Sequence, residues 1–141
     1  MEPEAPRTEA LAVATRALAR REHSQRSLRE RLQRSGVTAD NAEAVVEELR
    51  HAGLVDDTRF AEERARVLAE RGKGDAAIRV ELERAGVATA EIEAALGGLD
   101  PERERAAALV ARRGATPATA RLLAGRGFDE EVVAALVAAE G

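Results

Sequence analysis

The sequence predicts an all-α protein of about nine short helices arranged as three tandem three-helix repeats. Apolar residues recur at helical spacing almost everywhere, and no stretch alternates strictly as a half-buried strand would. Helix stop and start signals also divide the chain into segments of helical length. A Gly-apolar turn returns along the chain at intervals typical of helical repeat arrays.

Each predicted helix stop is a glycine, the residue that most readily takes the left-handed conformation after a helix. These stops are Gly36, Gly53, Gly72, Gly86, Gly97-Gly98, Gly114 and Gly127. Side-chain oxygens that can cap a first turn provide the start signals. They are Ser24, Asp40, Asp56 or Asp57, Asp75, Thr89, Asp100, Thr116 and Asp129. The predicted helices span 9–22, 25–35, 40–52, 57–71, 75–85, 89–97, 101–113, 117–126 and 129–139, after an expected disordered tail at 1–8.

The repeats appear when the glycine turns are aligned. Leu28, Leu32, Gly36 and Val37 match Ile78, Leu82, Gly86 and Val87, and a weaker third copy has Leu123, Gly127 and Phe128. The glycines of successive copies are 50 and 41 residues apart, within the period range of helical arrays. We therefore expect repeat boundaries at 9–53, 54–99 and 100–141.

Composition excludes several classes of protein. The 141 residues include no Cys, which excludes disulfides, Cys-ligated zinc, iron–sulfur clusters and thiol nucleophiles. No apolar run approaches the ~18 residues of a membrane span, and the acidic, Pro-bearing start is unlike a secretory signal. The sequence predicts a soluble cytoplasmic protein that makes no membrane contact. The net charge of −4 argues against a globally basic nucleic-acid binder.

Charge alternates in blocks along the chain. Residues 16–36 carry seven Arg against two acids, and residues 40–63 carry eight acids against two Arg. The pattern continues with weaker amplitude to the C-terminus, and 21 of the 22 basic residues are Arg. Basic patches of this kind steer binding to acidic partners. The alternative is that basic and acidic helices of neighbouring repeats face each other.

Neither a catalytic nor a metal-binding constellation is predicted, and no cofactor is expected. His23 and His51 stand 28 residues apart without further ligands at metal-binding spacing. Asp56-Asp57 is explained more simply by helix capping than by acid–base chemistry. The segment Gly72–Gly74 lacks the frame of a phosphate-binding loop. The pattern is therefore typical of an interaction protein and not of an enzyme.

Four segments, in order, resemble the RecX family of recombination regulators. Residues 53–61, GLVDDTRFA, resemble its G-[YL]-[ILV]-[DN]-D-x-x-[FY]-A signature. Residues 21–32 (REHSQRSLRERL), 71–87 (RGKGDAAIRVELERAGV) and 123–128 (LAGRGF) are similar to its flanking motifs. The matching positions are Asp56, Asp57, Phe60, Gly72, Gly74, Ile78, Leu82, Gly86, Gly127 and Phe128.

The resemblance implies an elongated, curved, all-α protein of three repeats that lacks enzymatic activity. Such a protein binds the RecA recombinase and its filament on single-stranded DNA. It inhibits filament extension, strand exchange, ATP hydrolysis and LexA co-cleavage, and so affects homologous recombination, DNA repair and the SOS response. We expect a monomer, with direct DNA binding by a helical module as the alternative and weak DNA contact beside RecA left open. By motif position and charge, the filament-facing candidates are Arg20, Arg21, Arg64, Arg71, Lys73, Arg79, Arg112 and Arg113.

Overall fold

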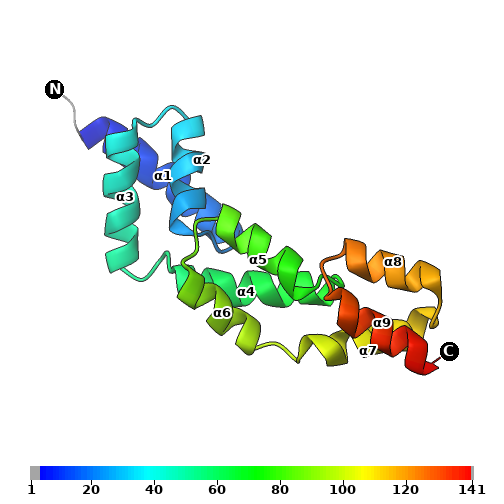
Figure 1. The fold of residues 1–141 in the computed structure, drawn as a ribbon. Coiled ribbons are helices and arrows are strands. Elements are labelled where there is room, and N and C mark those ends of the chain that lie inside the picture. Colours follow the sequence, from blue (N-terminus) through cyan, green and yellow to red (C-terminus); the bar gives the residue numbers. More distant parts are fainter. Residues whose placement is uncertain (1–3, 141) are drawn as a thin grey trace. The chain divides into compact units, whose positions relative to one another are not determined.

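The computed structural model describes residues 4–140, in which short turns join α-helices. This range contains nine helices and no strand, so the predicted all-α fold is confirmed. Figure 1 shows them in chain order. They are α1 (Glu4–Arg20), α2 (Gln25–Arg34), α3 (Ala39–His51), α4 (Asp57–Glu70), α5 (Asp75–Arg84), α6 (Thr89–Gly97), α7 (Glu102–Arg113), α8 (Pro117–Gly125) and α9 (Glu130–Glu140).

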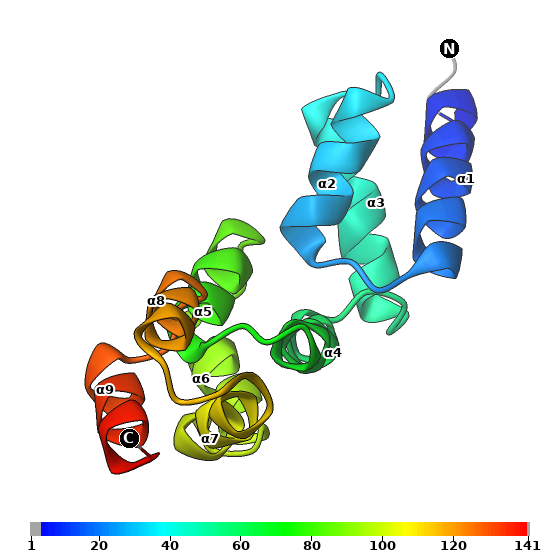
Figure 2. The same cartoon turned by 90° about the vertical axis from the view of Figure 1, so that its right-hand side faces the viewer.

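The chain divides into two compact units. The first comprises the chain up to Ala61 together with the turn Ala85–Val87, and the second comprises Glu62–Arg84 and the chain from Ala88 onward. Within the first unit α1, α2 and α3 form a bundle, as Figures 1 and 2 show. Within the second unit α5 packs on α6, and α7, α8 and α9 form a further bundle. The repeat boundaries given above stay a prediction.

The core of the first unit combines small residues of α1 with larger ones of α2 and α3. Ala10, Ala14 and Ala17 of α1 are buried, and their small side chains let the neighbouring helices approach closely. Leu28 and Leu32 on α2 are fully buried at the four-residue spacing of a helix face. This core therefore needs few bulky residues, in keeping with the alanine-rich composition.

Helix α1 begins earlier than predicted. The predicted tail covered residues 1–8, of which 1–3 lie outside the described residues, whereas residues 4–8 are helical. Pro6 falls in the first turn, where the missing N–H has no helical partner to lose. The guanidinium of Arg7 also pairs with the carboxylate of Glu48 on α3 and ties this turn to the bundle.

The predicted caps are confirmed at some helices and wrong at others. Ser24 and Thr116 cap their helices as predicted, each accepting a backbone N–H three residues later. At α3, however, the cap is Thr38, whose Oγ1 accepts from Asn41 N at 3.2 Å, so the Asp40 prediction is wrong. Thr38 takes the cap because its extended backbone aims the hydroxyl back at the first turn.

Three more cap predictions are wrong because the helix begins at a different residue. Thr89 is the first residue of α6, whose cap position is Ala88, and Asp100 precedes Pro101, the cap position of α7. Asp75 is the first residue of α5, and its backbone N–H donates to Glu102 Oε2 at 2.8 Å. A carboxylate from α7 thus satisfies the start of α5.

A close backbone contact joins the start of α5 to the end of α8 in the second unit. Gly74 N donates to the carbonyl of Arg126 at 2.8 Å, and Ala76 N donates to the carbonyl of Gly127 at 3.2 Å. A Cβ at Gly74 would lie 2.4 Å from backbone atoms of Gly127 and Phe128. Only glycine permits this approach.

The first unit contains an equivalent contact at the start of α2. Ser24 Oγ donates to the carbonyl of Ala85 at 2.7 Å, and Gln25 N donates to Asp57 Oδ1 at 2.8 Å. A Cβ at Gly86 would lie 2.8 Å from Arg26 Nε and 2.9 Å from its Cβ. The chain therefore uses one type of contact twice: the N-terminal end of a helix, α2 or α5, contacts the glycine turn that follows α5 or α8.

We predict that Gly74→Ala destabilises the second unit, because backbone atoms of Gly127 and Phe128 already occupy the space that the new methyl group needs. Overpacking of this kind costs about 1–3 kcal/mol in free energy of unfolding. The matched control is Gly97→Ala, whose Cβ would meet no atom within 4 Å, and which should leave stability unchanged or slightly raised. Urea unfolding of both variants checks this, and equal stabilities would contradict the proposed close contact.

His23 is a buried titratable residue in the linker between α1 and α2. It is 3% exposed, and its Nδ1 lies 2.9 Å from Ser27 Oγ. Burial lowers the pKa of His23 from its ordinary value of 6.5, and the charges of Arg21 and Arg31 lower it further, while a backbone hydrogen bond involving Ala17 opposes the shift. The folded first unit therefore favours the neutral imidazole.

This lowered pKa predicts that the protein loses stability as the pH falls below the ordinary value of 6.5. In that range the unfolded chain binds a proton at His23 that the folded chain resists, so the free energy of unfolding falls with pH. His23→Gln should flatten this fall, whereas His51→Gln, at an exposed histidine, should retain it. Urea unfolding at about pH 7.5 and about pH 5.5 measures the difference, and identical pH dependence in wild type and His23→Gln would refute the prediction.

Candidate functional site

The described residues hold no group of three or more His, Cys, Asp or Glu side chains arranged to bind a metal ion. His23 is buried beside α2, and His51 is exposed beside Glu47 at the end of α3. None of the helices in residues 4–140 is both long and apolar enough to cross a membrane.

The two signature aspartates each accept a hydrogen bond from a backbone N–H at the start of a helix. Asp56 Oδ1 accepts from Arg59 N at 3.0 Å and caps α4. Asp57 Oδ1 accepts from Gln25 N at the start of α2. Each carboxylate thus satisfies a backbone N–H that a helix start leaves without a helical partner.

The remaining signature positions form cores and turns. The four apolar ones are buried: Phe60, Ile78, Leu82 and Phe128. Gly72, Gly86 and Gly127 have positive φ angles, and Gly74 makes the close contact described above. The signature therefore specifies packing and turn geometry.

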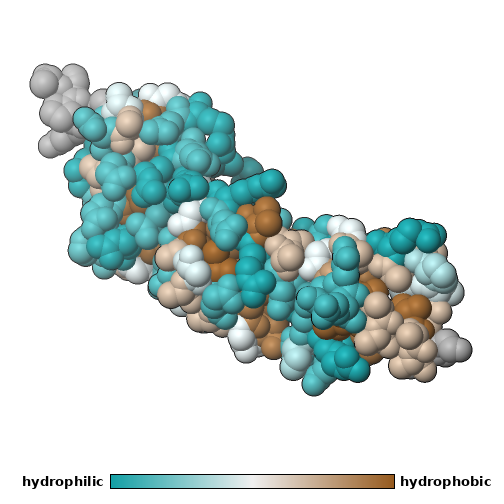
Figure 3. All heavy atoms as spheres, in the orientation of Figure 1, coloured by the Kyte–Doolittle hydropathy of each residue, from teal (hydrophilic) through white to brown (hydrophobic). Residues whose placement is uncertain are grey.

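Five of the eight basic candidates are exposed arginines at the C-terminal ends of α1, α4 and α7, which are the first helices of the three predicted repeats. Arg20 is the last residue of α1, with Arg21 directly after it, and Arg71 directly follows α4. Arg112 and Arg113 end α7. None of these five has an ion-pair partner within its own unit among the described residues. Figure 3 shows that the visible face of the first unit is mostly hydrophilic.

Two other candidates, Arg64 and Arg79, are engaged in ion pairs. Arg64 Nε lies 2.6 Å from Glu81 Oε2, and Arg79 Nε lies 2.7 Å from Glu93 Oε2. The hydrogen bond to Glu93 raises the pKa of Arg79, and the same bond lowers the pKa of Glu93. A partner must compete with these carboxylates to bind either guanidinium.

Lys73, the eighth candidate, lies in the turn between α4 and α5 with a basic neighbour that the sequence prediction missed. This neighbour is Arg126, whose Nη1 would lie 2.9 Å from a Cβ at Gly72. Arg126 therefore lies against the turn that contains Lys73 and follows Arg71. Arg126 was missed although it belongs to the LAGRGF motif, because its distance from Lys73 in sequence hides their proximity.

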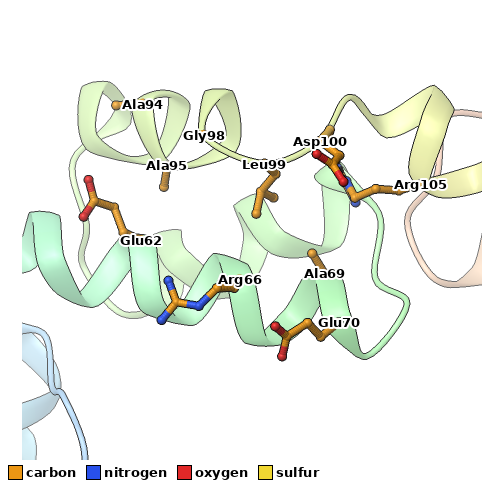
Figure 4. Close-up of a pocket in the computed structure, with 10 residues that line it drawn as sticks. All are labelled: Glu62, Arg66, Ala69, Glu70, Ala94, Ala95, Gly98, Leu99, Asp100 and Arg105. Carbon is orange, nitrogen blue, oxygen red and sulfur yellow. Dashed lines mark hydrogen bonds between the residues drawn. The ribbon is translucent and has the colours of Figure 1, made fainter.

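An acidic groove also lies in the second unit, between α4 and α6 (Figure 4). Its three lining carboxylates belong to Glu62, Glu70 and Asp100. Its two guanidinium groups are already paired, Arg66 with Glu63 and Arg105 with Asp75. The groove is thus unsuited to an acidic or phosphate ligand, and none of the basic candidates lines it.

Two protein-family models match this chain. Residues 10–49 match the first three-helix domain of RecX, and residues 56–96 match its second three-helix domain. Together these matches cover more than half of the chain.

Curated relatives extend the similarity over most of the chain. Regulatory protein RecX of Stenotrophomonas maltophilia (strain K279a) is 40% identical over 126 residues, which cover 82% of this chain and 77% of the relative. Regulatory protein RecX of Acidithiobacillus ferrooxidans (strain ATCC 53993 / BNL-5-31) is 35% identical over 139 residues, covering 90% and 87%. Both are named as regulatory proteins and not as enzymes.

Solved structures share the fold. The crystal structure of RecX from Lactobacillus salivarius matches with a TM-score of 0.79 at 16% identity, covering 96% of this chain and 97% of that chain. A second crystal structure of regulatory protein RecX matches with a TM-score of 0.78 at 21% identity, covering 93% and 72%. From the family domains and the identity to curated relatives, the chain belongs to the RecX family of regulatory proteins.

Proposed function

We propose that this protein regulates the RecA recombinase by binding RecA and its filament on single-stranded DNA. Binding inhibits filament extension, strand exchange, ATP hydrolysis and LexA co-cleavage, and it takes place in the cytoplasm. Membership of the RecX family supports the regulatory role. The protein acts by binding and not by catalysis.

This proposal rests on one observation: exposed arginines recur at the C-terminal ends of α1, α4 and α7. The pairs Arg20-Arg21 and Arg112-Arg113 end α1 and α7, and Arg71 follows α4. A guanidinium presents a planar fork that binds a carboxylate through two hydrogen bonds. Positive charge also suits a helix C-terminus, so the same positions satisfy the helices while remaining open to a partner.

Several separate contacts suit a polymeric partner. Once one arginine site is bound, a second site on the same chain binds at a raised effective concentration. Each unit offers its own exposed arginines, Arg20 and Arg21 in the first and Arg112 and Arg113 in the second. Modest single contacts can then add up to firm attachment to a filament.

The alternative function is direct DNA binding through the same exposed arginines. The net charge of −4 argues against tight binding to naked DNA. A salt titration separates the two, because binding through many phosphates gives a steep slope of log affinity against log salt concentration. Tight, strongly salt-dependent binding to naked DNA would favour the DNA-binding alternative.

We predict that the double variant Arg112→Glu, Arg113→Glu inhibits RecA-driven ATP hydrolysis on single-stranded DNA less well than wild type. Loss of charged contacts worth about 1.4 kcal/mol or more raises the half-inhibitory concentration about tenfold or more. The matched control is Arg103→Glu, an exposed arginine in the first turn of the same helix α7, which should inhibit like wild type. Equal inhibition by the folded double variant would remove these residues from the interface, and a wild type that fails to inhibit would overturn the proposed function.

A further inference from the structure

Three glycine turns in the chain have the same backbone form. Helices α2, α5 and α8 are followed by Gly36, Gly86 and Gly127, whose φ angles are +96°, +83° and +93°. The residues before them, Ser35, Ala85 and Arg126, therefore occupy equivalent positions. Any difference in what covers these turns is informative.

The chain itself covers the second and third turns. At the second, Ser24 Oγ donates to Ala85 O. At the third, Gly74 N donates to Arg126 O, and a Cβ on Gly127 would lie 2.6 Å from Ala77 Cβ. In both cases the cover is the N-terminal end of a helix whose cap residue is small, either serine or glycine.

Among residues 4–140, nothing covers the first turn in this way. A Cβ at Gly36 would meet no atom within 4 Å, and Ser35 and Gly36 are both exposed. Their carbonyls accept no backbone or side-chain hydrogen bond from the described residues. A groove of about 650 Å³ adjoins this turn, between it and α1. Its lining includes Ala12 and Val13 of α1 together with Val37 and Thr38, and α1 contributes one acid, Glu9, and one base, Arg16.

A second copy of the chain fits this groove poorly. The equivalent helix start that the chain leaves available is that of α8, where Pro117 follows the cap Thr116. Proline has no N–H, whereas the equivalent Gln25 and Asp75 each donate one to a carboxylate.

We propose that the Gly36 turn and its groove seat the N-terminal end of a RecA helix that begins with a small cap residue and an acidic first turn. This inference rests on the proposed function. The two internal contacts define the geometry of the occupant. The open carbonyls at the end of α2 carry partial negative charge, which suits the positive end of an incoming helix. Exposed Arg16 in the groove and Arg34 in the last turn of α2 suit acidic side chains in that helix.

The first test fills the groove with a large side chain. Ala12→Trp introduces an indole at an exposed, groove-lining position of α1, and Ala44→Trp places the same ring at an exposed position of α3 outside the groove. We expect Ala12→Trp to raise the half-inhibitory concentration for RecA-driven ATP hydrolysis at least tenfold and Ala44→Trp to leave it unchanged, with both melting like wild type. Full inhibition by Ala12→Trp, with wild type active, would overturn this inference alone. A wild type that does not inhibit RecA would overturn the proposed function and this inference with it.

The second test identifies the occupant without relying on the stability of a variant. A photoreactive benzoylphenylalanine at position 12 is irradiated in the full chain bound to RecA filaments on single-stranded DNA, and the adduct is mapped by mass spectrometry. A cross-link to the start of a RecA helix with an acidic first turn supports the proposal. A cross-link to another kind of RecA segment, a cross-link to a second copy of this chain, or no cross-link while inhibition persists would each overturn it.

Discussion

The structure depends on one repeated contact, in which the N-terminal end of a helix is seated on a glycine turn later in the chain. In the second unit this contact brings Gly74 so close to Gly127 that no side chain fits between them. In the first unit a serine hydroxyl makes the equivalent contact with Ala85. Because a buried backbone carbonyl needs a donor, these contacts satisfy polar groups and fix the register of the helices together.

Much of this architecture could be predicted from the sequence, because glycines and helical periodicity act locally. Each of Gly36, Gly53, Gly72, Gly86, Gly114 and Gly127 has the positive φ expected of a helix stop. Helix starts were harder to predict, since Thr38 and Asp40 are both good caps and only the backbone decides between them. Contacts between distant residues, such as Glu102 with the start of α5, have no local signal. The proximity of Arg126 to Lys73 was missed for the same reason.

The candidate site was predicted by charge and by motif, and the structure separates its members. Arg64 and Arg79 belong to ion pairs that help to join neighbouring helices. The arginines at the C-terminal ends of α1, α4 and α7 are exposed and have no such partner within their units among the residues that the structure describes. The family signature, by contrast, consists of residues that build turns and cores. A pattern of shared sequence therefore identifies the scaffold, while the binding residues must be found from exposure and pairing.

We propose that the arginines at the C-terminal ends of α1, α4 and α7 bind a RecA filament. The most direct measurement is a cryo-electron microscopy structure of this protein on RecA filaments assembled on single-stranded DNA. We expect Arg20 or Arg21 and Arg112 or Arg113 to lie within hydrogen-bond distance of RecA carboxylates. A complex in which these guanidinium groups face solvent, or contact only DNA phosphates, would contradict it.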